Sequence, residues 1–210
     1  MAAIFCAAFG ALGWLVSHSS PGYIDQAAAN IGGDGSLTAW YLTISGFFPT
    51  QALIAAVLIA SALITRRHIS EAFAASIALL AAQIAIMPAK TVFHRVRPIH
   101  WFVRHEYTLS YPSGHAATAI AFLGILAYFV WRSALPKWVR SSLATLLIAW
   151  VLAISCSRIA LGAHYLTDVI GGWLIGAACL CATLAAYGGM GQSTGQAADR
   201  PRSSTGKLYA

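Results

Sequence analysis

Long apolar stretches are the feature that most restricts how this chain can fold. There are six of them in the 210 residues, at positions 2–16, 37–64, 72–88, 116–131, 142–157 and 169–187. An α-helix needs roughly 20 apolar residues to cross a bilayer, so we expect the shorter stretches to extend into their polar flanks. Only 9% of the residues are charged, against about 25% in ordinary soluble domains. The sequence therefore predicts an all-α integral membrane protein, a bundle of six transmembrane helices.

Two regions depart from a simple series of spans. The stretch 37–64 is long and contains Gly46 and Pro49, so we expect a kink or a re-entrant start there. After residue 190 the chain becomes rich in Gly, Ser, Thr and Gln, without an apolar period. We therefore expect one six-span membrane domain over residues 1–190 and a disordered cytoplasmic tail over residues 191–210.

The basic residues are unevenly distributed between the connections, and this predicts an orientation. Lys and Arg concentrate on the cytoplasmic side of membrane proteins. With both termini inside, six spans place these basic residues in the cytoplasm: Arg66, Arg67, Arg132, Lys137, Arg140, Arg200, Arg202 and Lys207. Five others fall on the outer face and need a reason other than topology: Lys90, Arg95, Arg97, Arg104 and Arg158. The positions of these charges between the apolar stretches therefore argue against a nucleic-acid partner as the reason for the net charge of +7.

Three polar clusters lie on that outer face. In the first, Lys90 and Arg97 are seven residues apart, so they share one side of a helix if the third span continues outward. In the second, Ser113 is a natural N-cap of the fourth span. The first amides of that helix, beginning with Gly114, offer an anion site beside His115. Taken alone, the first cluster could be a snorkelling basic collar and the second a simple helix cap.

The third cluster lies between the fifth and sixth spans and contains Arg158, His164 and Asp168. His164 and Asp168 are four residues apart, so on a helix they face the same way. A carboxylate on one imidazole nitrogen leaves the other nitrogen as a nucleophile or base. Gly162 lets the chain turn, which brings Arg158 back towards His164. A structural Arg–Asp pair at a helix end is the alternative, but ionisable groups at membrane depth are costly and usually functional.

Together, the three clusters would form one pocket at the outer ends of the third to sixth helices. It would hold three permanent cations, two histidines and one carboxylate. This set lacks the several carboxylates that Mg²⁺ or Ca²⁺ prefers and the thiolates of a structural zinc site. The four cysteines lie inside the apolar stretches instead. We therefore expect a site for a tetrahedral anion and no metal.

Taken in order, Lys-x6-Arg-Pro, Pro-Ser-Gly-His and Ser-Arg-x5-His-x3-Asp resemble the signature of the type 2 phosphatidic acid phosphatase superfamily. The hydropathy is similar to that of the membrane lipid-phosphatase branch of this superfamily. The short loops resemble those of its bacterial members. The resemblance implies that His164 is a nucleophile forming a phosphohistidine, that Asp168 orients it and that His115 is the general acid. It also implies that no metal or other cofactor takes part and that phosphate is held by Lys90, Arg97, Ser113, Gly114 and Arg158.

The resemblance implies a lipid phosphatase of the bacterial inner membrane, surrounded by membrane lipids, with its site facing the periplasm or the exterior. The substrates of such members are undecaprenyl pyrophosphate, phosphatidylglycerol phosphate, phosphatidic acid and lipid A phosphates, and we favour the isoprenyl carrier. Two alternatives stay open: a lipid phosphotransferase that uses the same phosphohistidine, and a non-catalytic anion carrier. The sequence indicates no particular oligomeric state.

Overall fold

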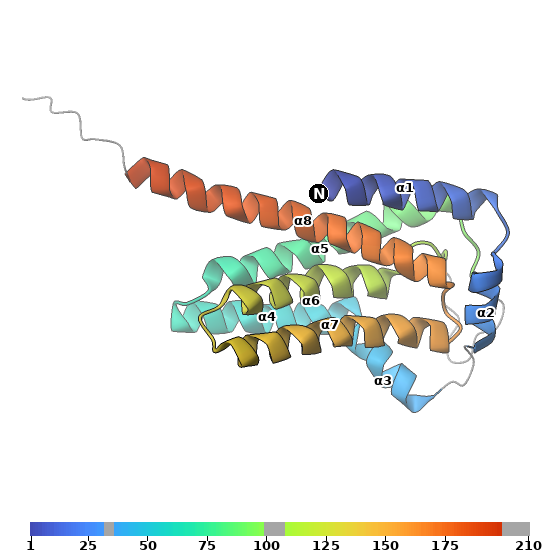
Figure 1. Ribbon diagram of the computed structural model, residues 1–210, viewed down its shortest axis with the longest axis horizontal. Helices are drawn as coiled ribbons and strands as arrows, with labels where there is room; N and C mark the ends of the chain where they lie inside the picture. The colour runs from blue at the N-terminus through green and yellow to red at the C-terminus, as the bar shows by residue number, and fades with distance from the viewer. Residues whose placement is uncertain (32–35, 99–107, 199–210) are drawn as a thin grey trace, which may run out of the picture.

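A computed structural model describes residues 1–31, 36–98 and 108–198 of the chain (Figure 1). Within these residues it contains eight helices and no strand, which confirms the all-α expectation. The helices are α1 (Ala2–His18), α2 (Tyr23–Ile31), α3 (Leu37–Ser45), α4 (Phe48–Thr65), α5 (Ile69–Phe93), α6 (Gly114–Arg132), α7 (Lys137–Ala160) and α8 (Leu166–Ala198).

The longer helices have the length and hydropathy of membrane spans. Five of those described, α4 to α8, meet this criterion. α1 meets it only together with α2, from which it is bent by 83°, so the described part of the chain has five or six spans. The expected spans at 72–88, 116–131, 142–157 and 169–187 correspond to α5, α6, α7 and α8. The chain is thus a multi-pass membrane protein.

The kink expected in the second apolar stretch is present at Gly46. α3 ends at Ser45, and α4 begins at Phe48 with Pro49 in its first turn. Proline is tolerated there because the first N–H groups of a helix have no intrahelical acceptor. A Cβ at Gly46 would lie 2.6 Å from the side chain of Ile154 and 3.2 Å from that of His115. The break between α3 and α4 therefore allows a close approach to α6 and α7.

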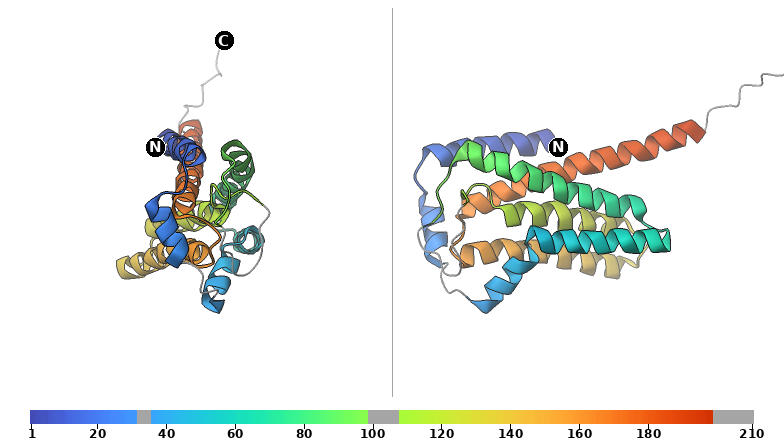
Figure 2. Two further views of the ribbon diagram at one scale, coloured as in Figure 1. Left: turned by 90° about the vertical axis from the view of Figure 1, so that its right-hand side faces the viewer. Right: turned by 180° about the vertical axis from the view of Figure 1, so that it is seen from behind.

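α6 lies in the middle of the bundle, where it packs against α5, α7 and α8 (Figure 2). Its contact with α8 is very close at Gly172 and Gly176. A Cβ at Gly172 would lie 2.5 Å from the carbonyl oxygen of Ser113, and one at Gly176 would lie 2.4 Å from that of Ala117. Small residues four apart let membrane helices pack backbone against backbone. This contact holds the first turns of α6 against the start of α8.

The connections bring the three sequence clusters to one end of the bundle. α5 and α7 end there, α6 and α8 begin there, and α2 lies across that end (Figures 1 and 2). The first cluster follows α5, the second opens α6, and the third joins α7 to α8. The arrangement agrees with the expectation that the clusters meet at the ends of the third to sixth spans.

Two helix boundaries differ from the sequence-based expectation. α5 ends at Phe93, so Arg97 is not on the same helix as Lys90, and that prediction was wrong. His94 takes the left-handed conformation (φ 46°), and its N–H donates to the carbonyl of Lys90, which closes the helix before Pro98. α8 continues through Ala198, so residues 191–198 of the expected tail are helical, and residues 199–210 lie outside the described residues.

Candidate active site

The two cations of the first cluster reach the same region from different elements. Lys90 is in the last turn of α5 and is 6% exposed. Its Nζ donates to the backbone carbonyls of Leu109 and Ser110. Arg97, in the segment after α5, donates from Nη1 to the carbonyl of Ala163 at 2.7 Å. Both side chains therefore contact the segments that carry the other two clusters.

His164 lies in the turn between α7 and α8, where Gly162 has a φ of 67°. It is therefore not on the same helix as Asp168, contrary to the expectation. Even so, its Nδ1 is 3.5 Å from Oδ2 of Asp168. Its Nε2 is 3.0 Å from Nη1 of Arg97. A guanidinium only donates, so Nε2 must carry the lone pair and Nδ1 the proton.

The surroundings of His164 favour its neutral form. Burial is the largest cause that lowers the pKa of this imidazole well below its ordinary value. The positive charges of Arg97, Arg158 and Lys90 lower the pKa further. The ring is therefore neutral at neutral pH, with a lone pair on Nε2. This is the form of histidine that can attack an electrophile.

The carboxylate of Asp168 is fully buried and is held by several donors. Nη1 of Arg95 donates to Oδ1 at 2.6 Å. The hydroxyl of Ser110 and the backbone N–H of Tyr165 both donate to Oδ2, the oxygen that faces His164. An acidic residue in the first turn of a helix is also stabilised by the positive end of the helix dipole. Asp168 is thus fixed as an anion beside the imidazole.

The start of α6 carries buried polar atoms that have no hydrogen-bond partner among the described residues. Ser113 is the N-cap residue, as expected, but its hydroxyl makes no capping hydrogen bond. Among the described residues, neither Oγ of Ser113 nor Nε2 of His115 has a hydrogen-bond partner, although both atoms are buried. Such atoms are rare in folded proteins. Beside the first amides of α6, which begin at Gly114, they fit a bound anion.

Arg158, the cation of the third cluster, is held by α3. It lies in the last turn of α7, is 2% exposed and donates from Nη1 to the hydroxyl of Thr43 at 3.5 Å. The Thr43 hydroxyl is 2.7 Å from Oγ of Ser157, which in turn donates to the carbonyl of Ile154. This series of hydroxyl groups fixes α3 against the end of α7 and orients the guanidinium.

The eight residues that the sequence singled out all lie at this end of the bundle. Charge interactions link His115 to His164 and to the cations Arg158, Arg97 and Lys90. Several residues that contact these groups were not predicted as site residues: Asp25, Thr43, Ser110 and Thr167. Asp25 carried a usable signal, because it is one of only six acidic residues in a strongly apolar chain.

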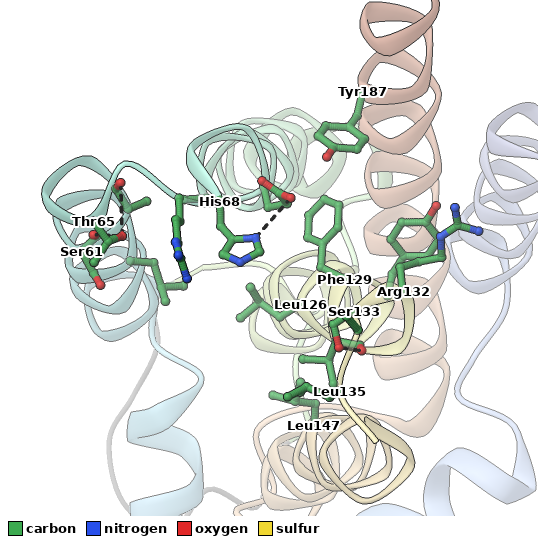
Figure 3. Close-up of a pocket in the computed structure, with 18 residues that line it drawn as sticks. Ser61, Thr65, His68, Leu126, Phe129, Arg132, Ser133, Leu135, Leu147 and Tyr187 are labelled. Atoms are coloured by element: carbon green, nitrogen blue, oxygen red, sulfur yellow. Dashed lines mark hydrogen bonds and ion pairs between the residues drawn. The ribbon is translucent and has the colours of Figure 1, made fainter. Parts of the chain in front are cut away.

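A pocket of about 840 Å³ lies at the opposite end of the bundle (Figure 3). It is lined by residues of α4 to α8 and by exposed charged groups, among them Arg67 and Arg132. It is therefore separate from the candidate site. Within the described ranges, no group of three or more His, Cys, Asp or Glu side chains could hold a metal ion. The cationic donor set of the candidate site suits an anion.

A comparison with known protein families matches the part of the chain that contains the three clusters. A family model described as the PAP2 superfamily matches residues 71–190. Phosphatidylglycerophosphatase B of Bacillus subtilis is 37% identical over 89 residues, which cover 41% of this chain and 43% of that protein. The match thus spans less than half the length of this curated relative.

The overall fold also has a solved counterpart. The crystal structure of a transmembrane PAP2-type phosphatidylglycerolphosphate phosphatase from Bacillus subtilis superposes with a TM-score of 0.76 at 21% identity. The superposition covers 91% of this chain and 96% of that one. The two proteins therefore share their helical architecture over almost their whole lengths.

Proposed function

The chain belongs to the PAP2 superfamily, and we propose that it is a membrane phosphatase that hydrolyses a lipid phosphate through a phosphohistidine, without a metal. The observation that carries this proposal is the buried His164. Its Nε2 lone pair faces Arg97 at 3.0 Å, and its Nδ1 faces Asp168 at 3.5 Å. A nucleophile is thereby held between an orienting carboxylate and a cation suited to phosphate.

In the first step, Nε2 of His164 attacks phosphorus. The N–P bond forms as the bond between phosphorus and the lipid oxygen breaks. Protonated His115 gives its proton to the leaving oxygen, a contribution typically worth about 10²–10⁴-fold. The imidazole of His164 keeps its Nδ1 proton, and the carboxylate of Asp168 stabilises the positive charge that the ring acquires.

In the second step, water attacks the phosphohistidine and His115, now neutral, accepts a proton from it. The N–P bond breaks, inorganic phosphate leaves and His164 returns to its neutral form. Positive groups hold the non-bridging oxygens as charge redistributes in both steps. We assign this role to Lys90, Arg97, Arg158, the hydroxyl of Ser113 and the amide of Gly114.

Among the candidate substrates we place phosphatidylglycerol phosphate first. The curated relative and the solved structure both carry the name of a phosphatase for this lipid. The isoprenyl pyrophosphate that the sequence analysis favoured has no comparable support. Undecaprenyl pyrophosphate is kept as a competing candidate substrate.

The decisive experiment is phosphate release by detergent-purified protein in the presence of EDTA. The panel contains phosphatidylglycerol phosphate, undecaprenyl pyrophosphate, phosphatidic acid and a lipid A phosphate. We expect release that His164→Ala abolishes and that His68→Ala, a histidine at the opposite end, preserves. With ³²P-labelled substrate, rapid quenching should trap an acid-labile, base-stable label on the wild-type protein only.

The outcomes separate the remaining functions. Release only after addition of an acceptor lipid, with the phosphate found on that lipid, would indicate a phosphotransferase. Folded protein that neither releases nor transfers phosphate would contradict the enzyme assignment and favour an anion carrier.

We further propose that the site faces the periplasm or the exterior of a bacterial inner membrane. The α4–α5 and α6–α7 connections, at the opposite end, carry Arg66, Arg67, Arg132 and Lys137. The positive-inside rule places that end in the cytoplasm. In a variant without native cysteines, Ser19→Cys at the site end should react with an impermeant maleimide in intact cells, whereas Ser133→Cys should react only after lysis.

A further inference from the structure

α2 presents one acidic side chain to the interior of the site end. The helix lies across that end, bent by 83° from α1 (Figure 2). Its neighbouring residues Tyr23 and Ile24 are exposed, whereas Asp25 is only 3% exposed. An ionised group is buried in this way only when its oxygens find donors. The contacts of Asp25 therefore show what the helix holds in place.

Those contacts connect Asp25 to the start of α8. Oδ2 of Asp25 accepts from Nη2 of Arg95 at 2.6 Å and from the hydroxyl of Thr167 at 2.7 Å. Oδ1 accepts from the backbone N–H of Thr167 at 3.0 Å. Nη1 of Arg95 donates to Oδ1 of Asp168 at 2.6 Å. One guanidinium therefore joins two buried carboxylates, Asp25 and Asp168.

The charges of this triad explain why two carboxylates are needed. Arg95 bound to Asp168 alone would neutralise the carboxylate that faces His164. With Asp25 present, the triad has two negative charges and one positive charge. Burial alone would lower the pKa of Arg95, but the charges and hydrogen bonds of Asp168 and Asp25 raise it above its ordinary value, so the guanidinium stays charged. Asp168 therefore keeps a net negative field towards Nδ1 of His164.

We propose that Asp25 is a positioning residue for phosphoryl transfer: it holds Arg95 and the first turn of α8 so that Asp168 remains anionic and aimed at His164. The inference rests on the proposed function of His164 as nucleophile. Within the described residues, the side chain of Asp25 bonds to Arg95 and Thr167 and to none of the reacting groups. It also lies outside residues 71–190, the part of the chain that matches the family model.

The test compares variants that change either the charge or the contact. Asp25→Asn keeps the shape and removes the charge, while Asp25→Glu keeps the charge. Thr167→Val removes the hydroxyl that donates to Asp25 and accepts from Arg95, without changing any charge. Gln26→Ala changes the exposed neighbour, whose side chain bonds only to the carbonyl of Pro21 among the described residues, and serves as the matched control.

We expect Asp25→Asn to lower kcat by about 10- to 100-fold, the usual cost of losing such an outer partner, with KM little changed. Asp25→Glu should recover most of this loss. Thr167→Val should lose less than Asp25→Asn, and Gln26→Ala should match the wild type. A helix anchor without an electrostatic role would instead make Thr167→Val as harmful as Asp25→Asn.

A second readout needs no turnover. In protein labelled with [¹⁵N]histidine, the titration of His164 can be followed by NMR. The charged groups that face this ring are Asp168, Arg97, Arg158 and Lys90, with His115 nearby and the Arg95–Asp25 pair behind Asp168. Loss of a negative charge from this set should move the titration of His164 to lower pH in Asp25→Asn.

The double variant Asp25→Asn/Arg95→Gln restores the net negative charge of Asp168, so the His164 titration should return from its position in Asp25→Asn towards that of the wild type. If Asp25→Asn does not fold, the double variant is compared with Arg95→Gln, which keeps the charge of Asp25, and the loss of that charge should again move the His164 titration to lower pH. No shift of the His164 titration in the comparison that folds, or a kcat of Asp25→Asn equal to that of the wild type, would overturn the inference. If wild-type protein hydrolyses no lipid phosphate, the proposed function fails, whereas the NMR result still decides the role of Asp25.

Discussion

Both ends of the helix bundle carry basic side chains, but the two ends differ in how these are held. At the site end, Lys90, Arg95 and Arg158 are buried, and each donates to fixed oxygen atoms. At the opposite end, Arg67 and Arg132 line a pocket and remain exposed. Burying a cation is costly, and it persists only where partners compensate. The same residue type is thus buried and held by protein oxygen atoms at the proposed binding site, and exposed at the end that we propose faces the cytoplasm.

The largest expected effect is the loss of activity when the histidine at the site end is replaced, compared with replacement of a histidine at the opposite end. His164→Ala removes the proposed nucleophile, and we expect the phosphatase activity to fall by at least about 10³-fold. His68→Ala, at the exposed end, should leave it unchanged. Phosphate release with both variants at equal folded concentration measures this difference. An active His164→Ala protein would show that the histidine at the site end is no more necessary for phosphate release than the histidine at the opposite end.

A smaller effect should follow from replacing arginine by lysine at each end. Arg158→Lys keeps the charge but loses the planar donor geometry, and we expect kcat to fall by about 10²-fold. Arg132→Lys should have no measurable effect, because an exposed cation needs no fixed geometry. Steady-state kinetics of the two variants would test this directly. Equal losses in both would mean that the opposite end also contributes to catalysis.

The third expected effect is a shift on the pH axis. Burial, and then the charges of Arg97, Arg158 and Lys90, lower the pKa of His164 below its ordinary value of 6.5. The neutral nucleophile is present above that lowered pKa and is lost as the pH falls through it. Arg97→Gln removes one positive charge, so the pKa of His164 should rise. As the pH is lowered, the residual activity of this variant should therefore begin to fall at a higher pH than the activity of the wild type. Arg67→Gln is the control at the exposed end and should leave the profile in place.

The smallest effect is expected from removing charge at the opposite end. The double variant Arg67→Ala/Arg132→Ala should change kcat less than about twofold, since exposed charges contribute little to local energetics. Its orientation in the membrane is the more sensitive measurement, because these residues belong to the basic groups that set topology. A large loss of kcat with correct orientation would show that the pocket takes part in the reaction.

The sequence predicted which residues gather at the site end better than it predicted their local geometry. The apolar stretches predicted the spans from α5 to α8, because hydropathy alone determines which segments can cross a bilayer. Motif spacing selected Lys90 and Arg97 correctly as neighbours of the third cluster. It placed them on one helix, however, and the left-handed His94 ends α5 between them.

The residues that the sequence could not assign to the site are those that have no fixed spacing from one of the motifs. Asp25 and Thr43 reach the site only because α2 and α3 fold back over the ends of α7 and α8. The break at Gly46 could be expected from the local Gly and Pro residues, but the placement of α2 and α3 depends on tertiary packing, which local patterns do not encode. Arg95 was noticed as an excess cation, but its partner Asp25 is 70 positions away in the chain.

The burial of the site cations also determines how the protein responds to ionic strength. Dissolved salt screens exposed charges over about 8–10 Å at physiological concentrations, but buried pairs are screened much less. The hold of Lys90 and Arg158 on a phosphate should therefore change little between dilute and concentrated electrolyte. The exposed arginines would lose their attraction for anionic head groups over the same range. A single chain of net charge +7 thus combines a salt-resistant electrostatic centre with a salt-sensitive surface.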